Sequence, residues 1–177
     1  MLKKAALSFA VLLLMSPFAA AQQNKAPASP PAHAQCKFSD GKTITVDYSS
    51  PRAKGRKIFG GLVPYGEVWR TGANEATTLV STADLTIDGK DVPAGKYTIF
   101  TVPEQDKWTL IINKHTGEWG IPYKYESEEL ARVPMQVSKT SSPVENFTVS
   151  FNQSGNACTL QMSWENTQAS VQISEKK

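Results

Sequence analysis

Apolar and polar residues alternate along most of the chain after residue 36, with the two-residue period of β-strands rather than the 3.6-residue period of helices. Ile44, Val46 and Tyr48, for example, fall on one face of such a strand. Runs of this kind cover residues 44–48, 77–81, 85–87, 97–102, 108–112, 133–137, 147–151, 160–164 and 171–173. Turn-forming pairs such as Asp88-Gly89 separate them. The pattern predicts an all-β antiparallel sandwich of about nine short strands, jelly-roll or immunoglobulin-like, with Pro134 placing its strand at a sheet edge.

The first 21 residues have the order of features that is typical of a secretory signal peptide. Lys3 and Lys4 form a basic start, residues 5–18 an apolar stretch too short to span a bilayer, and the alanines ending at Ala21 a small-residue cleavage site. Cleavage after Ala21 would leave 156 of the 177 residues, enough for one domain with its own core. The sequence therefore predicts an exported protein, periplasmic or secreted, with no transmembrane anchor in its mature form.

Residues 22–35 contain three prolines and several alanines but almost no large apolar side chain. A stretch of this composition buries too little surface to order itself, so we expect a disordered Pro/Ala-rich tether. The single domain is then expected to span residues 36–174. Its cysteines, Cys36 and Cys158, would mature in an oxidising compartment, and we expect them to form a disulfide rather than two free thiols.

The net charge and its distribution along the chain indicate which kinds of ligand the protein could bind. Removing the signal peptide lowers the net charge from +3 to about +1, which disfavours charge-driven binding of nucleic acid. Residues 37–72 carry seven basic and three acidic side chains, whereas residues 73–177 carry nine basic and thirteen acidic ones. The basic part of the chain is therefore the place to look for an anionic ligand.

Residues 50–77 separate two predicted strands and are too long for an ordinary connection. Glycines and prolines recur every few positions, which predicts a sharply turning backbone, while Ile58, Phe59, Val63 and Trp69 provide apolar anchors. We therefore expect one long ordered loop laid across the sandwich. Loops of this length are often functional.

The polar side chains of this loop are of the types that bind small ligands. Arginine matches carboxylate, phosphate or sulfate groups with two parallel hydrogen bonds, and aromatic faces stack on sugars or cations. The candidate ligand-binding residues are Arg52, Arg56, Tyr65, Trp69, Arg70, Asn74 and Glu75. Two alternatives remain open. The arginines could pair with Glu67, Glu75 or later acidic residues in a structural network, and the loop aromatics, including Trp119, could be hydrophobic anchors.

Catalysis is less well supported than binding, and whether the protein is an enzyme stays open. A nucleophilic triad would depend on His115, since the other histidine of the mature chain, His33, lies in the predicted tether. Glu67 and Glu75 could be the acid and base of an envelope hydrolase acting on glycan or peptide, which is the alternative function. A structural or interaction protein is the third possibility. Two histidines leave too few ligands for a three-ligand zinc site, so no metal or cofactor is expected.

Residues 69–77 read W-R-T-G-A-N-E-A-T, and the motifs D-G-K-D-V-P-A-G-K-Y-T-I-F-T-V-P and W-T-L-I-I-N-K follow later in the chain. These motifs resemble those of an exported bacterial family, domain of unknown function 2911. The resemblance covers about residues 50–173. It implies a single exported domain, often with a Pro-rich leader, and it implies no activity. The hallmark positions of the family fall on Arg52, Arg56, Gly60, Pro64, Tyr65, Trp69, Arg70, Gly72, Asn74 and Glu75.

Overall fold

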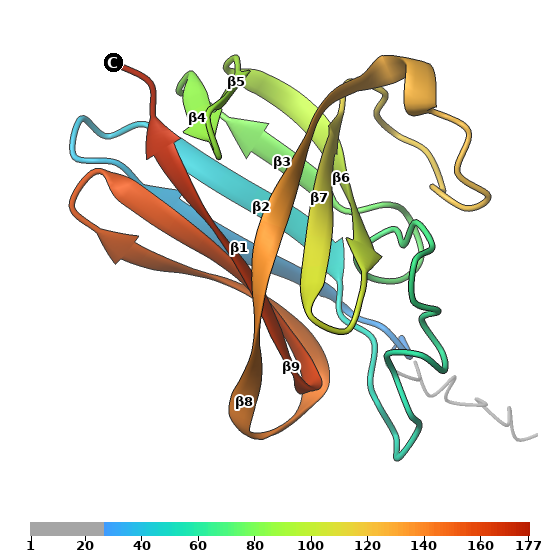
Figure 1. Ribbon diagram of the computed structural model, residues 1–177. Helices are drawn as coiled ribbons and strands as arrows, with labels where there is room; N and C mark the ends of the chain where they lie inside the picture. Colours follow the sequence, from blue (N-terminus) through green and yellow to red (C-terminus); the bar gives the residue numbers. More distant parts are fainter. Residues whose placement is uncertain (1–26) are drawn as a thin grey trace, which may run out of the picture.

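The computed structural model describes residues 27–177 and contains nine β-strands and one short 3-10 helix in that range (Figure 1). The strands are β1 (Pro31–Lys37), β2 (Thr43–Ser49), β3 (Thr78–Ser81), β4 (Leu85–Ile87), β5 (Lys90–Val92), β6 (Gly95–Pro103), β7 (Lys107–Asn113), β8 (Glu129–Ser154) and β9 (Ala157–Glu175). The short helix, η1 (Glu126–Glu128), precedes β8. The predicted signal peptide and the beginning of the predicted tether lie outside the described residues. Within residues 27–177, no helix is long and apolar enough to cross a membrane.

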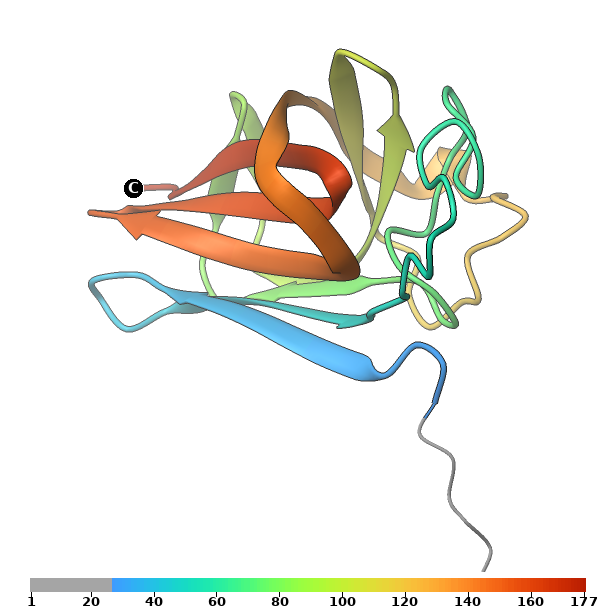
Figure 2. The same ribbon diagram turned by 90° about the horizontal axis from the view of Figure 1, so that it is seen from below.

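The nine strands form one sheet in the order β1-β2-β3-β6-β7-β8-β9-β4-β5, and every neighbouring pair is antiparallel. The sheet curls on itself. Figure 2 shows β1 and β2 (blue to cyan) as a layer beneath the hairpin of β8 and β9 (orange to red). The predicted all-β antiparallel fold of about nine strands is therefore confirmed, and its layered form is compatible with the predicted sandwich.

The last two strands are much longer than predicted. β8 has 26 residues and β9 has 19, and each combines two strands that the pattern separated. They form one hairpin that turns between Ser154 and Ala157, with register shifts between Lys139 and Thr148. Because the alternation of apolar and polar residues breaks at these shifts, the sequence pattern indicated separate strands.

Pro134 lies on a part of β8 that is paired on one side only, as its predicted edge position requires. β8 as a whole lies between β7 and β9, but Pro134 is paired with Thr109 of β7, and the pairing with β9 begins at Gln136. Its neighbours Val133 and Met135 keep their partners on β7. The loss of a single N–H donor therefore leaves the ladder with β7 intact.

Residues 31–35 form most of β1, so the prediction of a disordered tether over residues 22–35 was wrong for this part. β1 pairs with β2 over its full length. Ala34 and Cys36 are buried, whereas Gln35 between them is exposed. The alternation is present in the sequence, but alanine side chains are too small for it to stand out among the prolines.

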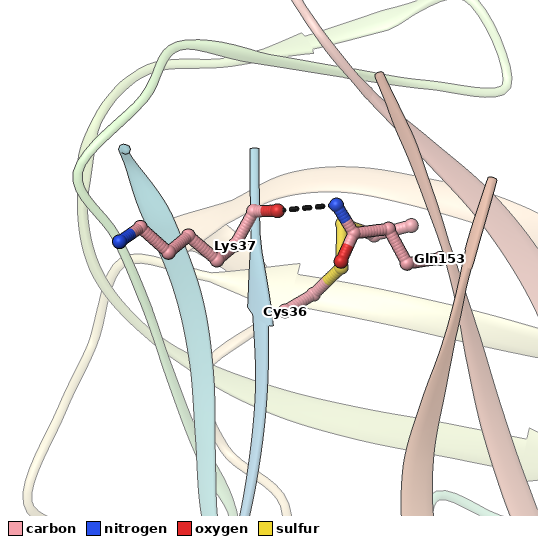
Figure 3. The surroundings of a disulfide bond; sticks show 4 residues. Cys36, Lys37 and Gln153 are labelled. Carbon is pink, nitrogen blue, oxygen red and sulfur yellow. Dashed lines mark hydrogen bonds between the residues drawn. A yellow bond between two sulfur atoms is a disulfide. The ribbon is translucent and has the colours of Figure 1, made fainter. Parts of the chain in front are cut away.

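Cys36 of β1 and Cys158 of β9 are joined by a disulfide, as predicted (Figure 3). Next to it, the side-chain amide of Gln153 donates a hydrogen bond of 2.6 Å to the backbone oxygen of Lys37. The disulfide links residues 122 positions apart. Together these contacts fix the first strand to the tip of the β8/β9 hairpin.

One hydrophobic core joins the inward faces of the strands. Ile99 of β6 and Leu160 of β9, for example, are completely buried in it. Phe59 and Trp69, from residues 50–77, belong to the same cluster. The predicted long ordered loop is therefore confirmed, and the core of the protein extends into it.

Candidate functional site

Residues 50–77, here called the 50–77 segment, connect β2 to β3 although these two strands are direct neighbours in the sheet. Paired neighbours can be connected by a few residues, so most of this length is not required by the topology. The segment (teal to green) lies at one end of the molecule, beside the loop of residues 114–125 (gold) that joins β7 to η1 (Figures 1 and 2). Isolated bridges at Arg52↔Asn146 and Trp69↔Thr101 tie it to the strands.

Trp69 anchors the 50–77 segment in the core. Its indole ring is stacked on that of Trp164 in β9 and makes edge contacts with Phe59 and Phe147. The indole N–H donates a hydrogen bond of 3.1 Å to the backbone oxygen of Gly72. Only 9% of Trp69 is exposed. The hydrophobic-anchor alternative therefore describes this residue.

The backbone between Thr71 and Asn74 is held in an uncommon conformation. These two residues have φ angles of 58° and 59°, and a positive φ is a real outlier for a β-branched threonine. At Gly72 a side chain would not fit, because a Cβ atom would lie 2.9 Å from the backbone oxygen of Ser49. The hydroxyl of Thr77 supports this turn by donating a hydrogen bond of 2.6 Å to the backbone oxygen of Thr71. Constrained backbone of this kind is concentrated at functional sites.

A cavity of about 400 Å³, here called the main cavity, lies against this turn. Its apolar wall includes Trp69, Trp164, Leu62, Val63, Val68 and Ile121, and its polar side chains are Ser29, Arg56, Glu67, Arg70 and Asn74. Small-molecule sites typically measure about 300–1,000 Å³ and combine an apolar lining with a few converging polar groups. The main cavity has both properties.

Arg70 is held on the wall of the main cavity by three contacts. Its Nη1 donates hydrogen bonds to the backbone oxygens of Asn74, at 2.5 Å, and Trp119, at 3.2 Å. Its guanidinium also lies over the Trp119 ring, 5.2 Å from the centroid, as in a cation–π contact. Burial lowers the pKa of Arg70 below its ordinary value, but arginine remains protonated at neutral pH. Arg70 therefore provides a positive charge in a fixed position.

Arg52, Arg56 and Arg70 form no ion pair with a carboxylate in the described part of the chain. The alternative in which they pair with Glu67 or Glu75 in a structural network is therefore not what the structure shows. Their charges remain available, and the 50–77 segment keeps the excess of positive charge that the sequence indicated.

The seven predicted ligand-binding residues do not all line the same space. Four of the seven line the main cavity, namely Arg56, Trp69, Arg70 and Asn74. Arg52 lines a smaller recess of about 330 Å³. Tyr65 is 40% exposed, and its ring covers Gly60, where a Cβ atom would lie 2.6 Å from the ring. Glu75 is exposed and lines neither space.

The groups expected for a hydrolase do not line one common cavity. Glu67 lines the main cavity, but Glu75 does not. His115 lines neither space; its Nδ1 lies 3.0 Å from a carboxylate oxygen of Glu128, and its ring stacks on Tyr125. Among residues 27–177, no group of three or more His, Cys, Asp or Glu could hold a metal ion.

Three residues of the cavity wall come from outside the 50–77 segment. Trp164 lies in the predicted strand at 160–164, Ile121 in the 114–125 loop, and Ser29 in the predicted tether. The backbone oxygen of Ser29 accepts a hydrogen bond of 3.3 Å from the side-chain amide of Asn74. These residues are distant from the 50–77 segment in sequence, and only the fold brings them to it, so no local signal could have found them.

Glu118, in the 114–125 loop, was also not singled out. It is 8% exposed, and neither carboxylate oxygen has a hydrogen-bond partner among the described residues. Its backbone oxygen accepts a hydrogen bond of 3.2 Å from the backbone N–H of Ala76, at the end of the 50–77 segment. Because burying a carboxylate without a hydrogen-bond partner costs free energy, Glu118 destabilises the contact between the 114–125 loop and the 50–77 segment.

The family model described as "protein of unknown function (DUF2911)" matches residues 29–173. This range contains eight of the strands entirely, most of β9, and every residue that lines the main cavity. The chain therefore belongs to this family. No curated protein and no solved structure matches the chain.

Proposed function

We propose that this protein is an exported binding protein whose main cavity holds a small ligand with an anionic group and a polar, carbohydrate-like body. The observation that carries the proposal is the presence of Arg56 and Arg70 on the wall of one cavity, with no carboxylate paired to either among the described residues. A guanidinium held in place without a counter-ion attracts carboxylate, phosphate or sulfate groups.

The other cavity residues suit the rest of such a ligand. The side-chain NH₂ group of Asn74 donates hydrogen bonds to the backbone oxygen of Ser29 and to the hydroxyl of Ser49. The amide oxygen of Asn74 is therefore left as an acceptor for a ligand hydroxyl. The carboxylate of Glu67 offers further acceptors. Trp69 and Trp164 supply an apolar wall of the kind that packs against a sugar ring.

Two features support the location of this function outside the cytoplasm. The Cys36–Cys158 disulfide fits a protein that matures in an oxidising compartment. The start of the sequence has the features of a signal peptide cleaved after Ala21. We therefore assign the binding function to the periplasm or the exterior of the cell.

Isothermal titration calorimetry with sugar acids, phosphorylated sugars and neutral sugars tests the proposal. We expect anionic members to bind more tightly than their neutral counterparts, for example glucuronate more tightly than glucose. Arg70→Ala should weaken binding of the anionic members at least about tenfold, because a charge-assisted hydrogen bond contributes on the order of 1.5–3 kcal/mol.

Arg132→Ala is the matched control. Arg132 is also an arginine, but it pairs with Glu129 through two short contacts and lines neither space. This variant should bind the ligand as the wild type does. The proposal is wrong if no member of the panel binds, or if the Arg70 and Arg132 variants lose affinity to the same extent.

A further inference from the structure

A second hollow adjoins the main cavity. It is the recess of about 330 Å³ that contains Arg52, here called the basic recess. Ser29, Pro51 and Arg56 line both spaces, so the two are adjoining parts of one depression. The remaining lining residues of the basic recess include Lys54. Three of its residues are therefore basic, and none is acidic.

A tight turn builds the basic recess. The backbone N–H of Arg56 donates a hydrogen bond of 3.0 Å to the oxygen of Ala53, and the two residues between them, Lys54 and Gly55, have φ angles of 49° and 69°. Positive φ at both central positions is the geometry of a type I′ turn. The backbone N–H of Ala53 bonds to the oxygen of Glu145 in β8, at 2.8 Å, which fixes the turn to the sheet.

The two arginines of the basic recess are held by backbone oxygens. Arg56 donates from Nε to the oxygen of Ala53, at 3.0 Å, and from Nη2 to the oxygen of Arg52, at 2.6 Å. Arg52 donates from Nη1 to the backbone oxygen and the hydroxyl of Ser50, at 3.0 and 2.9 Å. These contacts orient both guanidinium groups without neutralising them, which lowers the entropy lost when an anion binds.

The carboxylate of Glu145 contacts this turn. Its Oε1 accepts a hydrogen bond of 2.9 Å from the backbone N–H of Lys54, and it does not line the basic recess. In the described part of the chain, neither arginine of the recess nor the side chain of Lys54 is in an ion pair. The recess therefore keeps a net positive charge.

We propose that the basic recess binds a second anionic group of the ligand that occupies the main cavity. The inference rests on the proposed function and gives it a ligand class: an acidic saccharide of at least two units, with one anionic group near Arg70 and another near Arg52 and Lys54. Arg56 lines both spaces and contacts the ligand at the junction between them. A single sugar acid occupies the main cavity alone and makes only part of these contacts.

The ratio of the affinity for digalacturonate to the affinity for galacturonate measures how much this second site contributes to binding. We expect wild-type protein to bind the two-unit probe at least about tenfold more tightly, because a second charge-assisted contact is added within one molecule. This ratio should fall towards one in Arg52→Ala and in Lys54→Glu. The Lys54 variant is included because the Arg52 side chain also supports the local fold, whereas Lys54 is exposed.

Lys90→Ala is the matched control, because Lys90 is an exposed lysine of β5 that lines neither space. Its ratio should equal that of the wild type. The inference is overturned if the ratio in wild type is close to one, or if Lys54→Glu and Lys90→Ala give the same ratio. The proposed function would still hold in that case, provided that galacturonate binds and that its binding depends on Arg70.

A titration with inorganic phosphate, monitored by NMR, distinguishes failure of the second anion site from failure of the proposed function. We expect the backbone amide signals of residues 52–56 to shift, and this shift to be lost in Lys54→Glu. If phosphate shifts these signals while neither uronate binds, the basic recess is an anion site and the proposed function fails. If phosphate shifts none of them, the basic recess is not an anion site and the inference is overturned.

Discussion

The indole rings of Trp69 and Trp164 are stacked, with centroids 6.0 Å apart and an angle of 18° between their planes. One ring comes from the 50–77 segment and the other from β9, so a residue between two strands is part of the core. Truncating a buried tryptophan typically costs about 3–5 kcal/mol. We expect Trp69→Ala to lower the free energy of unfolding by about this amount.

Urea unfolding of Trp69→Ala beside Trp119→Ala checks this expectation. Trp119 is 55% exposed, and its replacement should change the free energy of unfolding by less than about 1 kcal/mol. Equal losses in the two variants would mean that the stacking on Trp164 does not stabilise the fold.

Arg70→Ala should lower the free energy of unfolding only moderately. Removing one partner of a buried ion pair costs about 3–5 kcal/mol, but Arg70 donates to two backbone oxygens and has no carboxylate partner among the described residues. We therefore expect a loss of about 1–2 kcal/mol in urea unfolding. A loss as large as that of a broken buried ion pair would show that Arg70 belongs to a structural network after all.

Glu118→Met should stabilise the protein. The buried carboxylate has no hydrogen-bond partner among the described residues, and methionine fills similar space without a polar group to desolvate. An unsatisfied buried polar group costs about 1–3 kcal/mol, so the free energy of unfolding should rise by an amount in this range. Glu126→Met, at an exposed glutamate, is the control and should change it by less than about 0.5 kcal/mol. A destabilised Glu118→Met would contradict the assignment of an unpaired carboxylate.

Loss of the disulfide should lower stability strongly. It closes a loop between residues 122 positions apart, for which the chain-entropy estimate is on the order of 4–5 kcal/mol. We expect a Cys36→Ala, Cys158→Ala double variant to lose up to this amount in urea unfolding. Denatured, unreduced wild type should contain no titratable thiol. Two titratable thiols, or a double variant as stable as the wild type, would contradict the bond.

The stability of the protein should depend on pH through Glu129. Arg132 donates two hydrogen bonds, of 2.6 and 2.7 Å, to this carboxylate, and Tyr123 donates one of 2.6 Å. These contacts hold the pKa of Glu129 below its ordinary value of 4.5. The stabilisation is therefore complete above about pH 4.5 and is lost as the pH falls through the lower pKa of the folded protein.

Unfolding of wild type and Glu129→Gln between pH 7 and pH 3 measures this effect. The wild type should be more stable than the variant at pH 7, and the difference should shrink as the solution becomes more acidic than pH 4.5. A difference that stays constant down to pH 3 would show that the pKa of Glu129 is not lowered.

The fold was largely predictable because alternation is the direct signature of a half-buried strand. β2 illustrates this, since its buried residues are those of the predicted apolar face. In β7 the predicted face of Trp108, Leu110 and Ile112 is buried too, but so are Ile111 and Asn113. β1 was missed because its inward residues are small, and the β8/β9 hairpin was divided because its register shifts interrupt the alternation. Both errors concern places where side-chain size or backbone irregularity hides the two-residue period.

The candidate site was predictable in location but not in detail. The 50–77 segment is unusual in composition, and four of its predicted residues line one cavity. Which residues face that cavity depends on the positive φ angles at Thr71 and Asn74, and these cannot be derived from alternation. Nor does alternation predict that Glu67 lines the main cavity while Tyr65, two positions earlier, covers Gly60, with Gly66 at a φ of 76° between them.

Phe59 and Trp69 share one cluster with the strands, and this has a consequence for how the 50–77 segment moves. A surface loop usually opens by itself, and its amide hydrogens exchange quickly with solvent. Here the segment cannot open without exposing the aromatic core, so its amides should exchange nearly as slowly as those of the central strands. A ligand in the main cavity would then raise the stability of the entire domain, because the site and the scaffold unfold as one cooperative unit.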